Sequence, residues 1–125
     1  MVTIIAFITK SMFKQPRPAK FFQSLNRLDE VNLIAGVDVY YGFNSFPSGH
    51  TMSAFAISTF LMLCFPQKWG LSLLLFALAA LTALSRMYLG HHFLQDVYLG
   101  ALLGVLLGGA MYLGMIKYSQ RQKNA

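Results

Sequence analysis

Long uncharged apolar runs dominate the second half of the chain. They cover residues 51–67, 69–85 and 97–116, and only small polar side chains interrupt them. A helix needs about 20 residues, at about 1.5 Å each, to cross a hydrocarbon core of about 30 Å. The third run meets that length comfortably, and the first two lie at the short end of the range. The pattern therefore predicts three complete transmembrane helices.

The first nine positions are also apolar, but at about 1.5 Å per residue they are too few to cross a bilayer. They lack the cationic segment and the cleavage site of a signal peptide. We interpret them as an N-terminal stub, the outer end of a spanning helix whose beginning is absent. A short interfacial stretch at a genuine N-terminus is the alternative.

Residues 10–46 are mixed and polar, which predicts an extramembrane segment. Apolar side chains recur in it at steps of three, at Phe22, Leu25, Leu28, Val31 and Ile34. This spacing favours a short amphipathic helix on the membrane interface. Steps of three also drift around an α-helix, so an irregular loop fits the pattern equally well.

The composition agrees with a membrane protein and changes the picture in three further ways. The chain has 125 residues, 56% of them hydrophobic, which bounds it to a single domain (1–125) and is too apolar for an ordinary soluble one. Its one cysteine, Cys64, excludes an intrachain disulfide. The net charge of +6 comes without a basic helical stripe or a nucleic-acid motif, so no nucleic-acid partner is expected. We therefore expect an all-α membrane helical bundle whose positive charges serve a phosphate site and the lipid bilayer.

Three clusters of polar and charged residues stand out in this apolar chain. They are Lys10 with Arg17-Pro18, Pro47 to His50, and Ser85-Arg86 with His92 and Asp96. Successive spans alternate sides, so all three clusters fall on one face of the membrane. Cations can neutralise a phosphoryl group while two histidines divide the nucleophile and proton-transfer work. Together the clusters predict a phosphate-handling catalytic site.

His92 and Asp96 are four residues apart where the third apolar run begins, so on a helix they stack on one face. Asp96 could hold one ring nitrogen protonated and leave the other free to attack. A helix cap and an interfacial anchor are the structural alternative for this pair.

The cluster at 47–50 precedes a long helix, whose N-terminus offers unpaired N–H groups to an anion. Gly49 allows the backbone to approach a phosphate oxygen, Ser48 adds a hydroxyl donor, and His50 could protonate a leaving oxygen. A plain helix cap is the alternative role of Ser48.

Arg17 and Arg86 can each make bidentate contacts to phosphoryl oxygens, and Lys10 supplies a compact charge. Taken singly, each cation could equally be a snorkelling anchor at the membrane border. No metal-ligand spacing is evident in the sequence, and no cofactor is expected.

The chain resembles the type 2 phosphatidic acid phosphatase family, whose motifs are Lys-x6-Arg-Pro, Pro-Ser-Gly-His and Ser-Arg-x5-His-x3-Asp. All three are intact and in order, and they extend over most of the chain. The resemblance implies that His92 attacks phosphorus to form a phosphohistidine, that Asp96 orients its ring, and that His50 protonates the leaving group and later activates water. It assigns the phosphoryl oxygens to Lys10, Arg17, Ser48, Gly49 and Arg86, and requires no metal. His91 does not fit the spacing and is expected to be an interfacial side chain.

The resemblance implies an integral membrane phosphatase acting on a lipid phosphate or diphosphate. We expect it in the bacterial inner membrane, with the site facing the periplasm. Membrane members of the family typically have six spanning helices. The chain is therefore expected to be an incomplete, N-terminally truncated core. A packing partner could stand in place of the missing helices. Two alternatives are a halide peroxidase, which the spans argue against, and a catalytically silent membrane scaffold or partner-binding fragment.

Gly100, Gly104 and Gly108 lie four residues apart in the last span, so they share one helical face. Such a face lets another helix approach closely. We favour packing within the same bundle over dimerisation.

Overall fold

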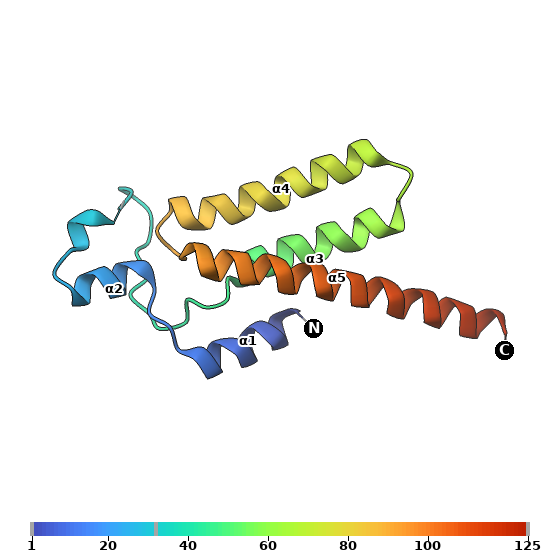
Figure 1. Ribbon diagram of the computed structural model, residues 1–125, viewed down its shortest axis with the longest axis horizontal. Helices are drawn as coiled ribbons and strands as arrows, with labels where there is room; N and C mark the ends of the chain where they lie inside the picture. The colour runs from blue at the N-terminus through green and yellow to red at the C-terminus, as the bar shows by residue number, and fades with distance from the viewer. Residues whose placement is uncertain (1, 32, 125) are drawn as a thin grey trace.

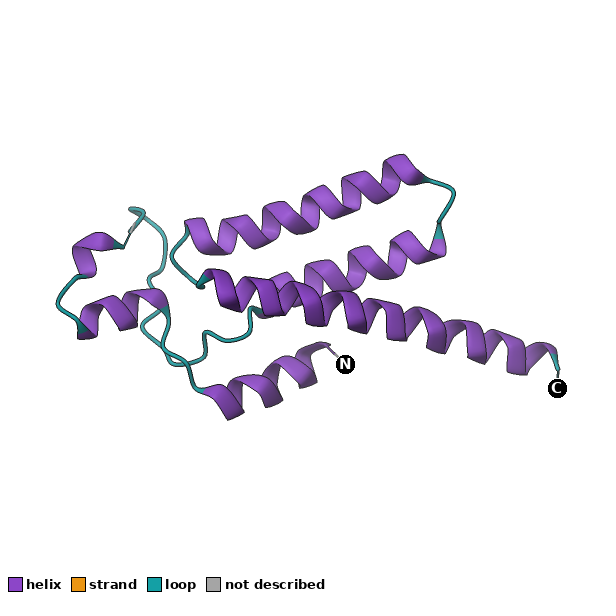
Figure 2. Cartoon of the chain, in the orientation of Figure 1, coloured by secondary structure: helices purple, strands orange, loops and turns teal. Residues whose placement is uncertain are grey.

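The computed structural model describes residues 2–31 and 33–124, and within them the chain consists of helices and loops without a strand (Figures 1 and 2). The helices are α1 (Val2–Phe13), α2 (Pro18–Ser24), the short 3₁₀ helix η1 (Leu28–Glu30), α3 (Gly49–Cys64), α4 (Trp69–Tyr88) and α5 (Leu94–Lys123). The predicted all-α class is confirmed.

Helices α3, α4 and α5 form an up-down-up bundle, and its most extensive contact joins α3 to α5. The glycines of α5 explain this contact. A Cβ atom added at Gly104 would come within 2.5 Å of the carbonyl oxygen of Met52, and one at Gly108 would come equally close to that of Ala56. Because these positions carry no side chain, the two helix backbones meet directly. The glycine stripe therefore packs within the bundle, as the sequence favoured.

Two helices, α4 and α5, are long and apolar enough to cross a membrane. Only 11% and 17% of their most apolar segments are buried, so their apolar surfaces face outward, unlike those of the core helices of a soluble protein. Helix α3 has 16 residues, or about 24 Å at about 1.5 Å each, which is short for a full span. The third complete span stays a prediction. The stub corresponds to α1, which packs against α3, and residue 1 lies outside the described part.

The extramembrane segment contains two short helical pieces in place of one continuous helix or an irregular loop. Helix α2 ends at Ser24, and η1 begins four residues later at Leu28. Asn26, between them, has a φ of 54°, which a continuing right-handed helix does not permit.

The three clusters lie at one end of the bundle, here called the motif end. Helices α1 and α4 finish there and α3 and α5 begin there, as Figure 1 shows. Lys10 belongs to the last turn of α1 and Arg86 to the last turn of α4, while His50 and Asp96 occupy the first turns of α3 and α5.

Candidate active site

The turn between α4 and α5 brings Arg86 and the two neighbouring histidines together. Gly90 follows the end of α4 with a φ of 64°, a conformation that glycine adopts without strain. The N–H of Gly90 donates to the carbonyl of Met87 at 2.9 Å, and the N–H of His91 donates to that of Arg86 at 3.0 Å. These two bonds make a Schellman motif. The turn explains why the third motif needs its particular spacing between arginine and histidine.

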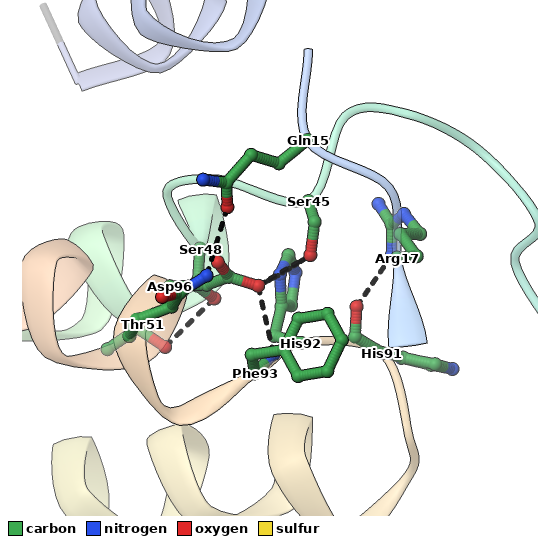
Figure 3. A network of polar contacts seen from close by, with 10 residues as sticks. Gln15, Arg17, Ser45, Ser48, Thr51, His91, His92, Phe93 and Asp96 are labelled. Carbon is green, nitrogen blue, oxygen red and sulfur yellow. Dashed lines mark hydrogen bonds and ion pairs between the residues drawn. The ribbon is translucent and has the colours of Figure 1, made fainter. Parts of the chain in front are cut away.

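His92 and Asp96 lie side by side and are almost completely buried, with 4% and 0% of their surface exposed. Nδ1 of His92 is 3.5 Å from Oδ2 of Asp96 (Figure 3). The same oxygen accepts the backbone N–H of Phe93 at 2.9 Å, which caps the start of α5. Asp96 therefore caps α5 and also lies beside the imidazole, while its role in orienting the ring stays a prediction.

Ser45 is a member of this cluster that the sequence analysis missed. Its side chain is fully buried, and its Oγ donates to Oδ2 of Asp96 at 2.5 Å and lies 3.5 Å from Nδ1 of His92 (Figure 3). The other carboxylate oxygen, Oδ1, is buried and has no hydrogen-bond partner among the described residues. No spacing in the sequence signals Ser45, because 51 positions separate it from Asp96.

Ser48 joins the second motif to the third through its backbone. Its N–H donates to the carbonyl of Asp96 at 2.9 Å. Its side chain is fully buried and makes no capping bond to α3, so the plain-cap alternative is not observed. Instead its Oγ accepts a hydrogen bond from Thr51 Oγ1 at 2.9 Å, which leaves the Ser48 hydroxyl proton for another acceptor.

Lys10, Gly49 and His50 line one cavity of about 320 Å³ between α1, α3 and α4, together with Ser53 and Thr82. A Cβ atom on Gly49 would lie 4.0 Å from Nζ of Lys10, so the start of α3 directly faces the ammonium group. The His50 side chain is exposed.

Electrostatic interactions link His50 to His92 and to three cations, Lys10, Arg17 and Arg86. Arg86 is half-buried, and its Nε lies 3.4 Å from Ser85 Oγ.

The structure thus brings all eight predicted site residues to the motif end. A larger groove of about 810 Å³, lined by Phe21, Phe93 and Tyr98, contains none of them.

Arg17 is half-buried at the start of α2, where its backbone and side chain are both held. Its N–H donates to the carbonyl of Gly42 at 2.9 Å, and its guanidinium donates to the carbonyl of His91 at 3.4 Å. The guanidinium also lies 4.8 Å from the centre of the Tyr40 ring. Burial lowers the pKa of Arg17, while Tyr40 and Asp96 oppose that change. Arginine stays protonated at neutral pH despite such a shift.

His91 is buried, whereas the sequence analysis expected an interfacial side chain. Its ring meets Tyr40 edge-on at 4.9 Å, and its Nε2 lies 3.2 Å from the carbonyl oxygen of Asp38. Burial lowers the pKa of His91, and the Asp38 carbonyl partly offsets the effect. His91 therefore links the loop before the second motif to the turn between α4 and α5, which carries the third motif.

Among residues 2–31 and 33–124, no three His, Cys, Asp or Glu side chains are grouped as metal ligands. The described side chains at the motif end include cations and imidazoles, which suit an anion directly. Metal independence stays a prediction.

The chain is similar to known proteins in sequence and in fold. The profile of the PAP2 superfamily matches residues 1–119. Lipid A 1-phosphatase of Porphyromonas gingivalis is 38% identical over 71 residues, which are 55% of this chain and 16% of that protein. Undecaprenyl-diphosphatase BcrC of Bacillus subtilis is 44% identical over 68 residues, 54% of this chain and 33% of that protein. The crystal structure of Aquifex aeolicus LpxE is similar with a TM-score of 0.70 and 36% identity, covering 90% of this chain and 61% of LpxE. The chain thus spans less than two thirds of each of these proteins.

Proposed function

Because the chain belongs to the PAP2 superfamily, we propose that it is a membrane phosphatase that hydrolyses a lipid phosphate or diphosphate through a phosphohistidine on His92. The observation that carries this proposal is the buried pair of His92 and Asp96, which lies at the same end of the bundle as Lys10, Arg17 and Arg86. A buried imidazole beside a carboxylate and several cations suits nucleophilic attack on an anionic phosphoryl group.

In the first half of the reaction, Nε2 of His92 attacks phosphorus. The P–N bond forms as the bond between phosphorus and the leaving oxygen breaks, and His50 gives a proton to that oxygen. Asp96 faces Nδ1, so it stabilises the positive charge that the ring gains. The exposure of His50 in the cavity leaves it accessible to a leaving group.

In the second half, His50 takes a proton from water as the water oxygen attacks phosphorus. The P–N bond breaks, its electron pair returns to Nε2 of His92, and inorganic phosphate leaves. An acid in one step is then the base in the next, as microscopic reversibility requires.

The phosphoryl oxygens are held by Lys10, Arg17 and Arg86, with the hydroxyl of Ser48 and the backbone at Gly49. The proximity of Gly49 to the Lys10 ammonium supports a shared oxygen site at the start of α3. Phosphoryl transfer depends mainly on such positioning and charge stabilisation.

The outward apolar faces of α4 and α5 support an integral membrane protein, and the names of the relatives support a lipid phosphate as the substrate class. A site at the end of a membrane bundle suits an amphiphile whose phosphate reaches the interface while its tail stays in the bilayer. We assign the protein to the bacterial inner membrane with the motif end on the periplasmic side.

The test is phosphate release by the 125-residue protein in detergent, with chelator present. The panel contains phosphatidic acid, phosphatidylglycerol phosphate, a polyprenyl diphosphate and a glycolipid phosphate. We expect release from at least one of them by the parent, and none by His92→Ala. Equal release from both would exclude the His92 mechanism, and no release by the parent would favour the scaffold alternative.

A further inference from the structure

The hydroxyl of Ser45 occupies a specific position between the two buried groups of the third motif. Its Oγ donates to Oδ2 of Asp96 and is 3.5 Å from Nδ1 of His92, the same separation that joins this nitrogen to Oδ2. Ser45 Oγ, Asp96 Oδ2 and His92 Nδ1 therefore all lie within 3.5 Å of one another. The Ser45 side chain is 0% exposed, so it does not face bulk solvent.

We propose that Ser45 is a positioning residue that fixes the tautomer and the orientation of the His92 ring. A serine hydroxyl has one proton to donate and two lone pairs with which to accept. Its proton is directed to Asp96, so toward His92 it acts as an acceptor and favours a proton on Nδ1. Nε2 is then left with its lone pair, the state that attack on phosphorus requires. This inference rests on the proposed function.

Backbone pairing holds Ser45 in place. Its N–H donates to the carbonyl of Gln15 at 3.1 Å, and the N–H of Arg17 donates to the carbonyl of Gly42 at 2.9 Å. These two hydrogen bonds join the segment before the second motif to the segment that carries Arg17. The Ser45 backbone is thus tied to the segment that carries Arg17, and its short side chain extends from this fixed backbone toward Asp96 and His92.

Because the contact between His92 and Asp96 is long, Ser45 is needed as a second group that constrains the His92 ring. Nδ1 is 3.5 Å from Oδ2 of Asp96 and 3.5 Å from Oγ of Ser45, both beyond the usual range of about 2.7–3.2 Å, so neither acceptor alone holds the ring tightly. Asp96 also accepts bonds from Phe93 and Ser45 at that oxygen, so its carboxylate alone constrains the ring weakly. A second acceptor on the same side of the ring restricts the tautomer further.

A purely structural serine would instead satisfy the buried carboxylate and leave the imidazole unaffected. The two roles differ in what they predict for Ser45→Ala. A structural role changes the stability of the fold, whereas a positioning role changes the protonation pattern of His92 and the chemical step.

The experiment compares the parent with Ser45→Ala and with Ser58→Ala. Ser58 is also a buried serine, but it donates to the carbonyl of Leu75 between α3 and α4, outside the site. We expect Ser45→Ala to lower kcat roughly 10- to 100-fold, the effect of losing a hydrogen bond to a charged group, with KM within about twofold. Ser58→Ala keeps the parent kcat. Ser45→Cys keeps a side chain of similar shape and a weak donor, so we expect its kcat to lie between those of the parent and Ser45→Ala. It replaces the alanine variant in the comparison if that variant does not fold.

Nitrogen-15 NMR of the His92 ring in detergent gives the second measurement, with the His92 signals identified by their absence in His92→Gln. We expect protonated Nδ1 and unprotonated Nε2 in the parent and a mixture of tautomers in Ser45→Ala. An unchanged tautomer in Ser45→Ala, or an equal loss of kcat in Ser58→Ala, would overturn the proposal. If the parent hydrolyses no lipid phosphate, the proposed function fails, yet the NMR comparison still decides whether Ser45 sets the His92 tautomer.

Discussion

Nδ1 of His92 lies 3.5 Å from Oδ2 of Asp96, and the two side chains are almost fully removed from solvent. The carboxylate belongs to the first turn of α5 and caps the start of that helix, so its position follows from the helix and its cap. This relationship is the basis of the proposed nucleophile, because it directs the opposite nitrogen of the ring away from the carboxylate.

Replacing Asp96 by asparagine tests the charge without removing the shape. The amide oxygen can take the place of Oδ2, where it still accepts from Phe93 and faces the ring, but the side chain loses its negative charge. We expect the rate of phosphoenzyme formation to fall about 10²- to 10⁴-fold, by analogy with other triads that lose their carboxylate. Single-turnover kinetics measure it, and a rate within tenfold of the parent would argue against an orienting role.

Gly104→Ala tests the contact between α3 and α5. The new methyl group would lie 2.5 Å from the Met52 carbonyl oxygen, so the helices must move apart. We expect a loss of about 1–3 kcal/mol in the free energy of unfolding, as for other overpacked sites. The matched control is Gly109→Ala, where nothing lies within 4 Å and helix propensity predicts a gain of about 0.5–1 kcal/mol. Denaturation in detergent that gave the two variants equal stability would contradict this packing.

Tyr40→Leu tests whether the aromatic ring holds Arg17. The ring centre is 4.8 Å from the guanidinium, and a partly exposed contact of this kind contributes about 0.5–1 kcal/mol. We expect the inhibition constant of vanadate, a phosphate mimic, to rise about two- to fivefold. Tyr40→Phe keeps the ring and should bind vanadate as the parent does. If Tyr40→Phe weakened binding as much as Tyr40→Leu, the ring contact would not be the cause.

His91 makes the stability of the loop contact depend on pH. Burial lowers its pKa in the folded protein from the ordinary value of 6.5, so below that value the unfolded chain binds the proton first. Stability is therefore fully present above pH 6.5 and declines as the pH falls toward the lowered pKa. We expect a smaller decline in His91→Gln, measured as the unfolding midpoint in detergent between neutral and acidic pH. Parallel curves for the two proteins would show that His91 does not cause the decline.

The sequence predicted the features that depend on local order and failed where distant segments meet. The uncharged runs predicted α4 and α5. The four-residue spacing of the glycines predicted the face of α5 that Gly100, Gly104 and Gly108 share. Alternation of spans gave the convergence of the motifs at one end. The break in the extramembrane segment was not predictable, because steps of three do not distinguish a helix from a turn at Asn26.

The contacts of Ser45 and Tyr40 were also beyond the sequence. Ser45 reaches Asp96 across 51 positions, and the Tyr40 ring lies between Arg17 and His91, which come from different segments. Neither residue has a spacing that marks it. Their positions depend on how the loop before the second motif folds against the turn after α4.

The most direct test of the account is to trap the covalent intermediate. The protein is mixed with a radiolabelled lipid phosphate that it hydrolyses and quenched in alkali, where a phosphorus–nitrogen bond on histidine survives, and the labelled residue is located by mass spectrometry. The account predicts label on His92, its absence in His92→Ala, and its retention in His91→Ala, which changes the adjacent buried histidine. Turnover without a label on His92, or a label on another residue, would contradict it.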